Sequence, residues 1–291
     1  MEGFNYPYAV KKVKVSDPIQ IAYVDEGYGD RTLLMIHGLG SYIPAWQKNI
    51  EGLKSQFRCI ALDLPNYGKS TKGFFPFTMS FFAEVLAAFI KKLELKNVTL
   101  VGHSMGAQIA VTTFLETDTP IQNLVLLAPA GFETFSAKDR NFFYKNVTAK
   151  FIKAMSVKQI KSNFDLNFHN NSLPQDADFM FRDRLSMRAD KVEYNFYAQM
   201  VPKCVRAMLE APVFDQLNQV DIPTLIIYGR EDLLIPNKAL HPESTIDQIA
   251  QAGHQQIPGS QLELISPCGH FVQWECPEKV NQLIADFFAP I

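Results

Sequence analysis

A serine, an aspartate and a histidine occur in this chain in an order that permits nucleophilic catalysis. Ser104 is the centre of a Gly-x-Ser-x-Gly pattern over residues 102–106, and Asp232 and His270 follow it. A serine hydroxyl attacks a carbonyl carbon when a histidine takes its proton and a carboxylate orients that histidine. The five-residue pattern alone is weak evidence, because at average Gly and Ser content it occurs by chance in roughly one chain in ten of this length.

The segments around Ser104 strengthen its assignment as the nucleophile. The strand-like run 97–101 precedes the pattern, and the helix-like run 107–111 follows it. A sharp strand-to-helix turn strains the serine backbone and exposes the hydroxyl, while the flanking glycines leave room for the strand and the helix. The new helix also directs its first N–H groups to this point. We therefore expect the N–H of Met105 to stabilise an oxyanion.

A second oxyanion donor is expected in the glycine-rich turn after another apolar run. His37-Gly38-Leu39-Gly40 follows the strand-like residues that end at Ile36. Gly38 and Gly40 permit unusual backbone angles, which would present the N–H of Leu39. The alternative is a simple glycine turn without a catalytic role. The position of residues 37–40 at a strand end favours the role of an oxyanion donor.

The candidate carboxylate and the candidate histidine each follow the end of a strand-like run, as Ser104 does. Asp232 follows the strand-like run ending at Tyr228, where a carboxylate could fix the tautomer of a histidine. Glu231 and Asp63 are the competing carboxylates, each with an alternative role in structuring its loop or facing solvent. His270 follows the last strand-like run and completes the order Ser, Asp, His.

The other histidines fit this role less well. His103 lies inside the serine turn, and we expect it to point away from the hydroxyl. Three more fall in an insertion or a loop, namely His169, His241 and His254.

The chain alternates between strand-like and helix-like segments, which predicts an α/β fold with a mostly parallel sheet. Residues 10–15 and 19–24 form a predicted N-terminal hairpin. Later apolar runs are typical of strands covered on both faces: 32–36, 59–62, 98–101, 124–127, 224–228 and 262–265. Helical spacing of apolar residues occurs in 79–93 and 277–288. Ligands of such sheets bind at the carboxyl ends of the strands.

The alternation stops over residues 131–212, which we interpret as a helical cap inserted into a core of 1–130 and 213–291. Ser136 to Asp139 resembles a helix cap, apolar residues then recur at helical spacing to 154, and Pro174 and Pro202 are predicted helix starts. The insertion contains ten of the 23 phenylalanines. They predict an apolar pocket, with Phe132 and Phe135 as its walls because they directly follow a strand end.

Composition excludes several classes of partner. The 28 Lys and Arg residues balance 30 Asp and Glu residues, so neither nucleic acid nor an anionic membrane is an expected partner. The N-terminal residues show no leader pattern, and four scattered cysteines fit a reducing compartment, so we expect a cytoplasmic protein. No helical His-x-x-x-His or similar cluster indicates a metal, and no cofactor is expected.

Together these motifs resemble the α/β-hydrolase superfamily over nearly the whole chain. The matching segments are 37–40, 63–70, 102–106, 229–232 and 269–270. The resemblance implies an eight-stranded sheet with a helical cap, Ser104 as nucleophile, His270 as general base and Asp232 as its orienting acid. Leu39 and Met105 would be the oxyanion donors.

The resemblance also separates branches of the superfamily. Haloalkane dehalogenases and epoxide hydrolases would have an aspartate where this chain has Ser104. Carbon–carbon bond hydrolases usually continue the first glycine motif as Gly-Pro-Gly, whereas here Gly40 is followed by Ser41 and Tyr42. The stretch 236–261 is longer than is typical before the histidine, and it is a candidate for an extra helix near the entrance or a homodimer contact.

The leading hypothesis is a serine hydrolase that cleaves a small apolar carboxylic ester, thioester or lactone through an acyl-enzyme intermediate. A ligand-binding or scaffold protein with little turnover is the alternative from another class. A lyase, a perhydrolase or a carbon–carbon bond hydrolase with the same residues also remains open.

Overall fold

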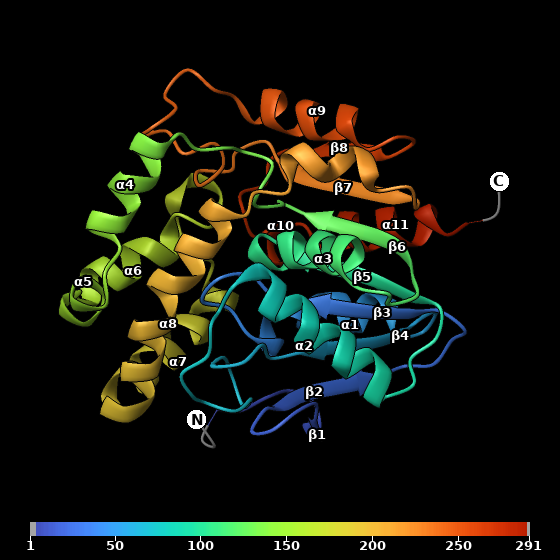
Figure 1. Cartoon of the computed structure of the whole chain (residues 1–291), viewed down its shortest axis with the longest axis horizontal. Coiled ribbons are helices and arrows are strands. Elements are labelled where there is room, and N and C mark those ends of the chain that lie inside the picture. Colours follow the sequence, from blue (N-terminus) through green and yellow to red (C-terminus); the bar gives the residue numbers. More distant parts are fainter. Residues whose placement is uncertain (1–3, 290–291) are drawn as a thin grey trace.

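The computed structural model describes residues 4–289 and contains one eight-stranded sheet with helices on both faces (Figure 1). The strand order is β1-β2-β4-β3-β5-β6-β7-β8. β2 pairs antiparallel with β1 and β4, and every later pairing is parallel. The strands are β1 (Lys11–Lys14), β2 (Gln20–Glu26), β3 (Thr32–Ile36), β4 (Arg58–Leu62), β5 (Val98–His103), β6 (Ile121–Leu127), β7 (Thr224–Gly229) and β8 (Gln261–Ile265).

The apolar runs of the sequence form the centre of this sheet. Every residue of β3, β5 and β7 is buried, as expected for strands covered by helices on both faces. β8 differs because it is an edge strand, and Gln261 and Glu263 are exposed. The prediction that this last run is covered on both faces was therefore wrong, and the charge of Glu263 is the signal for an exposed face.

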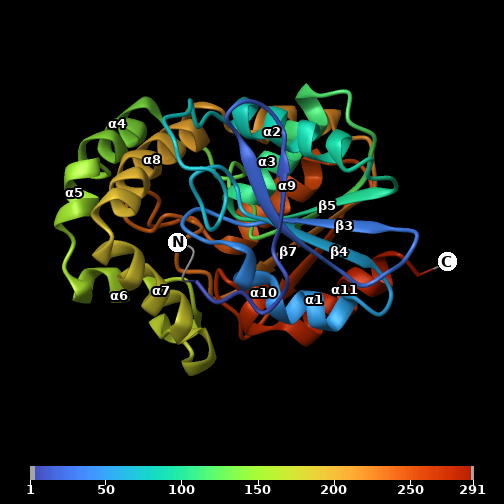
Figure 2. The same cartoon turned by 90° about the horizontal axis from the view of Figure 1, so that it is seen from below.

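Two layers of helices cover the sheet (Figure 2). α2 (Met79–Lys92), α3 (Met105–Glu116) and α9 (Ile246–Gln256) lie on one face, and α1 (Gln47–Leu53), α10 (Val272–Glu275) and α11 (Pro277–Phe287) lie on the other. Phe82, Leu86 and Phe89 of α2 are fully buried at the predicted three-and-four spacing. This arrangement and the sheet order are those of the predicted α/β-hydrolase fold.

A group of helices between β6 and β7 lies to one side of the sheet, at the left of Figure 1. These are α4 (Ala137–Asn146), α5 (Ala149–Ala154), α6 (Val157–Asp165), α7 (Asp178–Ala189) and α8 (Lys191–Glu210). Short 3-10 helices complete the fold: η1 (Ile43–Trp46), η2 (His169–Asn171), η3 (Gln175–Ala177) and η4 (Phe214–Gln219).

The helix boundaries of this group partly follow the sequence signals. Ser136 caps α4 in a capping box with Asp139, as its sequence predicts. The continuous helical spacing to residue 154 is interrupted, because α4 ends at Asn146 and Thr148 caps α5. Pro174 precedes η3, but Pro202 was wrongly predicted to begin a helix, because it lies inside α8, which Asp190 caps instead.

The stretch 236–261 contains α9, the crossover helix between β7 and β8. A capping box of Thr245 and Gln248 starts this helix, and Ile246 and Ala250 bury its inner face against the sheet. It therefore belongs to the layer of core helices. The loop before it, residues 236–244, approaches α4 through His241 and Asp139. Among residues 4–289, no helix combines the length and the apolar character that crossing a membrane requires.

Candidate active site

Ser104 occupies a strained turn between β5 and α3. Its backbone angles are φ 55° and ψ −118°, a conformation that a non-glycine residue adopts only when its surroundings enforce it. A Cβ atom on Gly102 would lie 2.4 Å from the carbonyl oxygen of Gly106, and one on Gly106 would lie 2.1 Å from that of Ile36. Glycine is therefore required at both positions so that the strand, the turn and the helix can approach one another.

Main-chain hydrogen bonds hold this turn at the end of the sheet. The N–H of Ser104 donates to Leu127 O at 2.9 Å, and its carbonyl accepts from Ala107 and Ala130. The serine side chain is left free to line a cavity beyond the strand ends.

His270 and Asp232 form a buried hydrogen-bonded pair. The distance from His270 Nδ1 to Asp232 Oδ2 is 2.7 Å, and the exposed fractions of the two side chains are 4% and 0%. The other carboxylate oxygen, Oδ1, accepts from the N–H groups of Leu234 and Ile235 at 2.8 and 3.0 Å. Because the carboxylate is fixed on both oxygens, it can hold the imidazole in one orientation with its Nδ1 protonated.

The two competing carboxylates have structural partners instead. Glu231 accepts hydrogen bonds from Ser266 Oγ at 2.7 Å and from the N–H of Cys268 at 2.8 Å. Asp63 is fully buried and accepts hydrogen bonds from Tyr6 Oη and from the N–H groups of Ile43 and Lys69. Each therefore stabilises a loop, and the carboxylate in contact with His270 is Asp232.

His103 has a positioning contact that the sequence did not reveal. Its Nε2 donates to the backbone carbonyl of His270 at 3.0 Å, and its ring packs against Phe271 with centroids 4.7 Å apart. Burial lowers the pKa of His103 well below its usual value, so the ring stays neutral. The position of His103 beside Ser104 was the sequence signal for such a role. Which loop its ring contacts could not be predicted, because that depends on the order of the neighbouring strands.

The two predicted oxyanion donors are located near Ser104. Met105 is the first residue of α3, so its N–H has no partner in the hydrogen-bond ladder of the helix. A Cβ atom on Gly38 would lie 3.1 Å from Ser104 Cβ, so the turn that carries Leu39 contacts the serine directly. His37 anchors this turn by accepting the N–H of Leu64 at 3.1 Å.

Ser104 and His270 line a cavity of about 490 Å³ between the sheet and the helices α4–α8. Most of its lining is apolar, and the wall opposite the sheet consists of side chains from these helices, among them Phe143, Phe151, Ile152, Phe164, Met187 and Met208. A volume of this size accommodates a small organic molecule.

The two predicted wall residues have different locations. Phe135 lines the cavity. Phe132 was wrongly predicted as a wall of the cavity. It is not among the residues that line the cavity, and its side chain is buried between the sheet and α9, against Tyr228 and Gly253. The chain turns at Gly131, with φ 83°, which directs the next side chain into the core.

A small polar group lies in the cavity at Arg184 of α7. Its guanidinium donates to the carbonyl of Gly40 and to Tyr197 Oη, and it covers the Tyr197 ring at 4.1 Å. Nearby, Tyr42 donates to Asp183 at 2.6 Å, and burial raises the pKa of that carboxyl. The cavity therefore contains a cation close to the predicted oxyanion turn. Within the described part of the chain, no three potential ligand side chains cluster as a metal site.

Comparison with known proteins identifies the family. A sequence profile of the alpha/beta hydrolase fold matches residues 31–277. The chain belongs to this α/β-hydrolase fold family. This result confirms the resemblance found in the sequence, and the strand order described above agrees with it.

Several members of this family are similar over nearly the whole chain. The 2-hydroxy-6-oxononadienedioate/2-hydroxy-6-oxononatrienedioate hydrolase 1 of Pseudomonas putida is 29% identical, and the alignment covers 95% of each chain. A probable hydrolytic enzyme from Pseudomonas aeruginosa PAO1 superposes with a TM-score of 0.84 at 22% identity, over 99% of this chain and 96% of that one. An esterase from Exiguobacterium antarcticum gives a TM-score of 0.78 at 21% identity, with 95% and 98% covered. At these identities the two solved structures establish the fold.

Proposed function

We propose that this α/β-hydrolase is a serine hydrolase that cleaves a small carboxylic ester, thioester or lactone. Ser104 Oγ attacks the carbonyl carbon while His270 Nε2 takes its proton, and Asp232 stabilises the resulting imidazolium. His270 then gives this proton to the leaving group, which departs from an acyl-enzyme on Ser104. Water, deprotonated by His270, attacks the acyl carbon, and the proton returns to Ser104 as the acid is released.

The observation that carries this proposal is the buried 2.7 Å pair of His270 and Asp232 at a cavity that is also lined by Ser104, a serine in a strained turn. Strained backbone is kept at a site where the surroundings enforce it, and such sites are often functional. A ligand-binding member of the fold would need neither the oriented imidazole nor the strained serine. In the proposed reaction, the N–H groups of Leu39 and Met105 bind the oxyanion.

The proposed substrate preference follows from the cavity walls, which the helices of the insertion supply in part. We treat residues 131–212 as a cap on the core formed by 1–130 and 213–291, because the cavity lies between the two parts. Its walls are largely apolar, which favours an uncharged acyl or alkyl group. Phe135 is one of these walls.

The test is a panel of 4-nitrophenyl esters of increasing acyl length, together with a thioester and a lactone. We expect turnover of at least one class by the wild-type protein and its loss in Ser104→Ala. Comparable rates for the two proteins on every substrate would contradict the proposal.

A second candidate function is hydrolysis of a carbon–carbon bond in a substrate that carries a carboxylate. The curated relative from Pseudomonas putida has a dienedioate in its name, and Arg184 places a guanidinium in the cavity of this chain. Replacing Arg184 by Met should then abolish turnover of a dicarboxylate ring-cleavage product and spare neutral esters. Absence of wild-type turnover of such dicarboxylates would eliminate this candidate.

We also propose a reducing, cytoplasmic location. All four cysteines are free, and three of them are buried. A protein folded in an oxidising compartment more often carries disulfides.

A further inference from the structure

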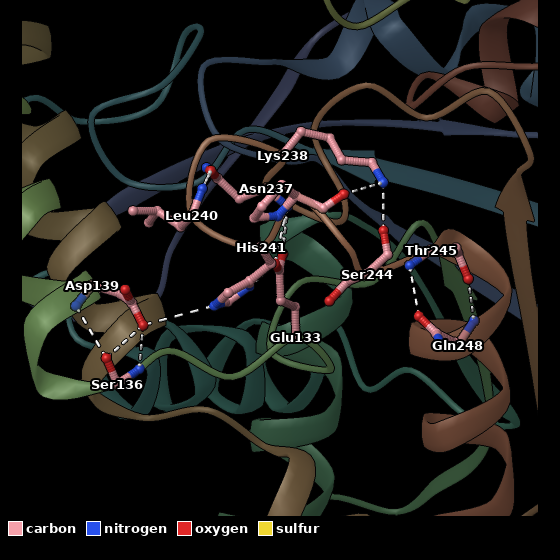
Figure 3. A network of polar contacts seen from close by, with 11 residues as sticks. Glu133, Ser136, Asp139, Asn237, Lys238, Leu240, His241, Ser244, Thr245 and Gln248 are labelled. Atoms are coloured by element: carbon pink, nitrogen blue, oxygen red, sulfur yellow. Dashed lines mark hydrogen bonds and ion pairs between the residues drawn. The ribbon is translucent and has the colours of Figure 1, made fainter.

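A second histidine–carboxylate pair, Glu133 with His241, lies beside the proposed catalytic site (Figure 3). His241 Nδ1 and Glu133 Oε1 form a short hydrogen bond, and the exposed fractions of the side chains are 24% and 6%. The N–H of Asn237 also donates to both oxygens of Glu133, at 3.0 and 3.1 Å. The carboxylate thus joins the segment after β6 to the loop after β7.

His241 also contacts the first helix of the cap. Its Nε2 lies 3.7 Å from Asp139 Oδ2, and Asp139 closes the capping box of α4 with Ser136. Figure 3 shows the imidazole between the two carboxylates. The ring of Phe135 stacks on the imidazole at 5.1 Å with an interplanar angle of 25°. One side chain therefore connects the exit from β6, the start of α4 and the loop after Asp232.

The residues held by this contact form one wall of the catalytic cavity. Phe135 and Glu133 line it from the β6 side, and Leu234, Ile235 and Asn237 line it from the loop. The same loop begins at Asp232, whose Oδ1 is bound by the N–H groups of Leu234 and Ile235. His241 thus fixes the far end of a segment whose near end orients the proposed acid.

Burial and hydrogen bonding act in opposite directions on the pKa of the Glu133 carboxyl. Burial raises the pKa of Glu133, and the nearby charge of Asp232 adds to this effect, whereas the hydrogen bonds from His241 and Asn237 lower it. A buried carboxylate that loses a donor becomes more costly to keep ionised. Without His241, Glu133 would retain only the N–H of Asn237 among the described donors.

We propose that Glu133 and His241 are positioning residues that set substrate selectivity. They hold the ring of Phe135 and the 234–237 loop as a rigid wall against the acyl chain. The inference rests on the proposed function for the identity of the substrate. It can be tested without a reaction at Ser104, because the same wall would contact the acyl chain of a product acid.

The experiment measures product binding in a Ser104→Ala background. Hexanoate and dodecanoate, as product acids of two lengths, displace a fluorescent apolar probe, and their dissociation constants are compared. His241→Leu removes both polar contacts of the imidazole. We expect the preference for dodecanoate over hexanoate to fall about tenfold, since a loosened wall contacts the longer chain less well. An unchanged preference in a folded variant would overturn the proposal.

Two further variants separate positioning from general damage. His241→Asn retains a donor close to the place of Nδ1, and it should restore the preference to within about twofold of the parent. Lys238→Met is the matched control, because Lys238 binds the carbonyls of Pro242 and Ser244 in the same loop and lies away from Glu133 (Figure 3). A loss in this control equal to that in His241→Leu would also overturn the proposal.

If His241→Leu fails to fold, a variant of Glu133 still tests the proposal. Glu133→Gln keeps an acceptor for both donors but removes the charge, so the preference should fall by about threefold. No change in this variant would contradict the inference. Failure of the proposed function is seen separately, as absence of ester turnover in wild-type protein that still binds the product acids.

Discussion

At the scale of single residues, the proposed catalytic groups all lie at the carboxyl ends of strands. Ser104 directly follows β5, Asp232 follows β7 and His270 follows β8, so three segments distant in sequence share one end of the sheet. Their types, order and strand-end positions were readable from the sequence because the strands are continuous apolar runs. The contact between Glu133 and His241 could not be predicted from the sequence. It depends on the path of the loop after β7, for which the sequence has no local signal.

The first prediction concerns Ser104 and His270 as a unit. Ser104→Ala or His270→Ala should lower kcat by on the order of 10⁴-fold, about 5 kcal/mol of transition-state stabilisation. The double variant should be little slower than either single variant, because each loss already removes the shared proton transfer. Steady-state rates of the three variants test this, and additive losses would show that the residues act independently.

The acid is tested by a pair of neighbouring variants. Asp232→Asn should lower kcat by about 10⁴-fold because the amide cannot hold the required tautomer, whereas Glu231→Gln should remain within about tenfold of the parent. Glu231 serves as the control because it binds Ser266 and Cys268 in the adjoining loop. The reverse ranking would transfer the role of the acid to Glu231.

At the scale of elements, the boundaries that the sequence mispredicted have physical causes. Helical spacing of apolar residues continues through Val147, but α4 ends at Asn146 and Thr148 supplies the N-terminal cap of α5. Pro202 lies inside α8 because neighbouring residues such as Ala198 and Cys204 are fully buried there, so packing outweighs the cost of a lost N–H. Local signals predict that helices exist better than where they end.

A half-buried ion pair between β2 and β4 gives a prediction at this scale. Asp25 accepts hydrogen bonds from Arg58 Nε and Nη2 at 2.9 and 3.0 Å, and this contact holds the pKa of the carboxyl below its usual 3.8. The contribution to stability is present above the pKa of the unfolded chain and is lost as the pH falls through the lower folded pKa.

Asp25→Asn should therefore lower the free energy of unfolding by about 1 kcal/mol at pH 7 and by progressively less below pH 4. Urea unfolding at several pH values measures this difference. Asp118→Asn, at an exposed position, is the control and should change little. A penalty in Asp25→Asn that persists at the lowest pH would show that it does not arise from the charge.

At the scale of the whole molecule, the cavity lies between the strand ends and the helices α4–α8, which we propose as a cap. The α/β alternation, its interruption and the apolar content of the insertion were all visible in the sequence. Which side chains face the cavity was not, because no local pattern separates Phe132, which is buried in the core after the turn at Gly131, from Phe135, which lines the cavity.

These two phenylalanines give a matched prediction. Phe135→Ala should change kcat/KM among esters of different acyl length and leave the melting temperature nearly unaltered. Phe132→Ala should lower stability by about 3–5 kcal/mol because it leaves a void in the core. Thermal unfolding and an ester series on both variants test the assignment. Equal effects of the two changes on stability would contradict it.

The most direct test of the central claim is covalent labelling of the folded protein with a fluorophosphonate, followed by peptide mapping. Such reagents react with an activated serine in the geometry of acyl transfer. We predict one phosphonyl group per chain, located on Ser104. His270→Ala should label far more slowly. Absence of labelling, or labelling at another residue, would contradict the proposal that Ser104 is the nucleophile of a serine hydrolase.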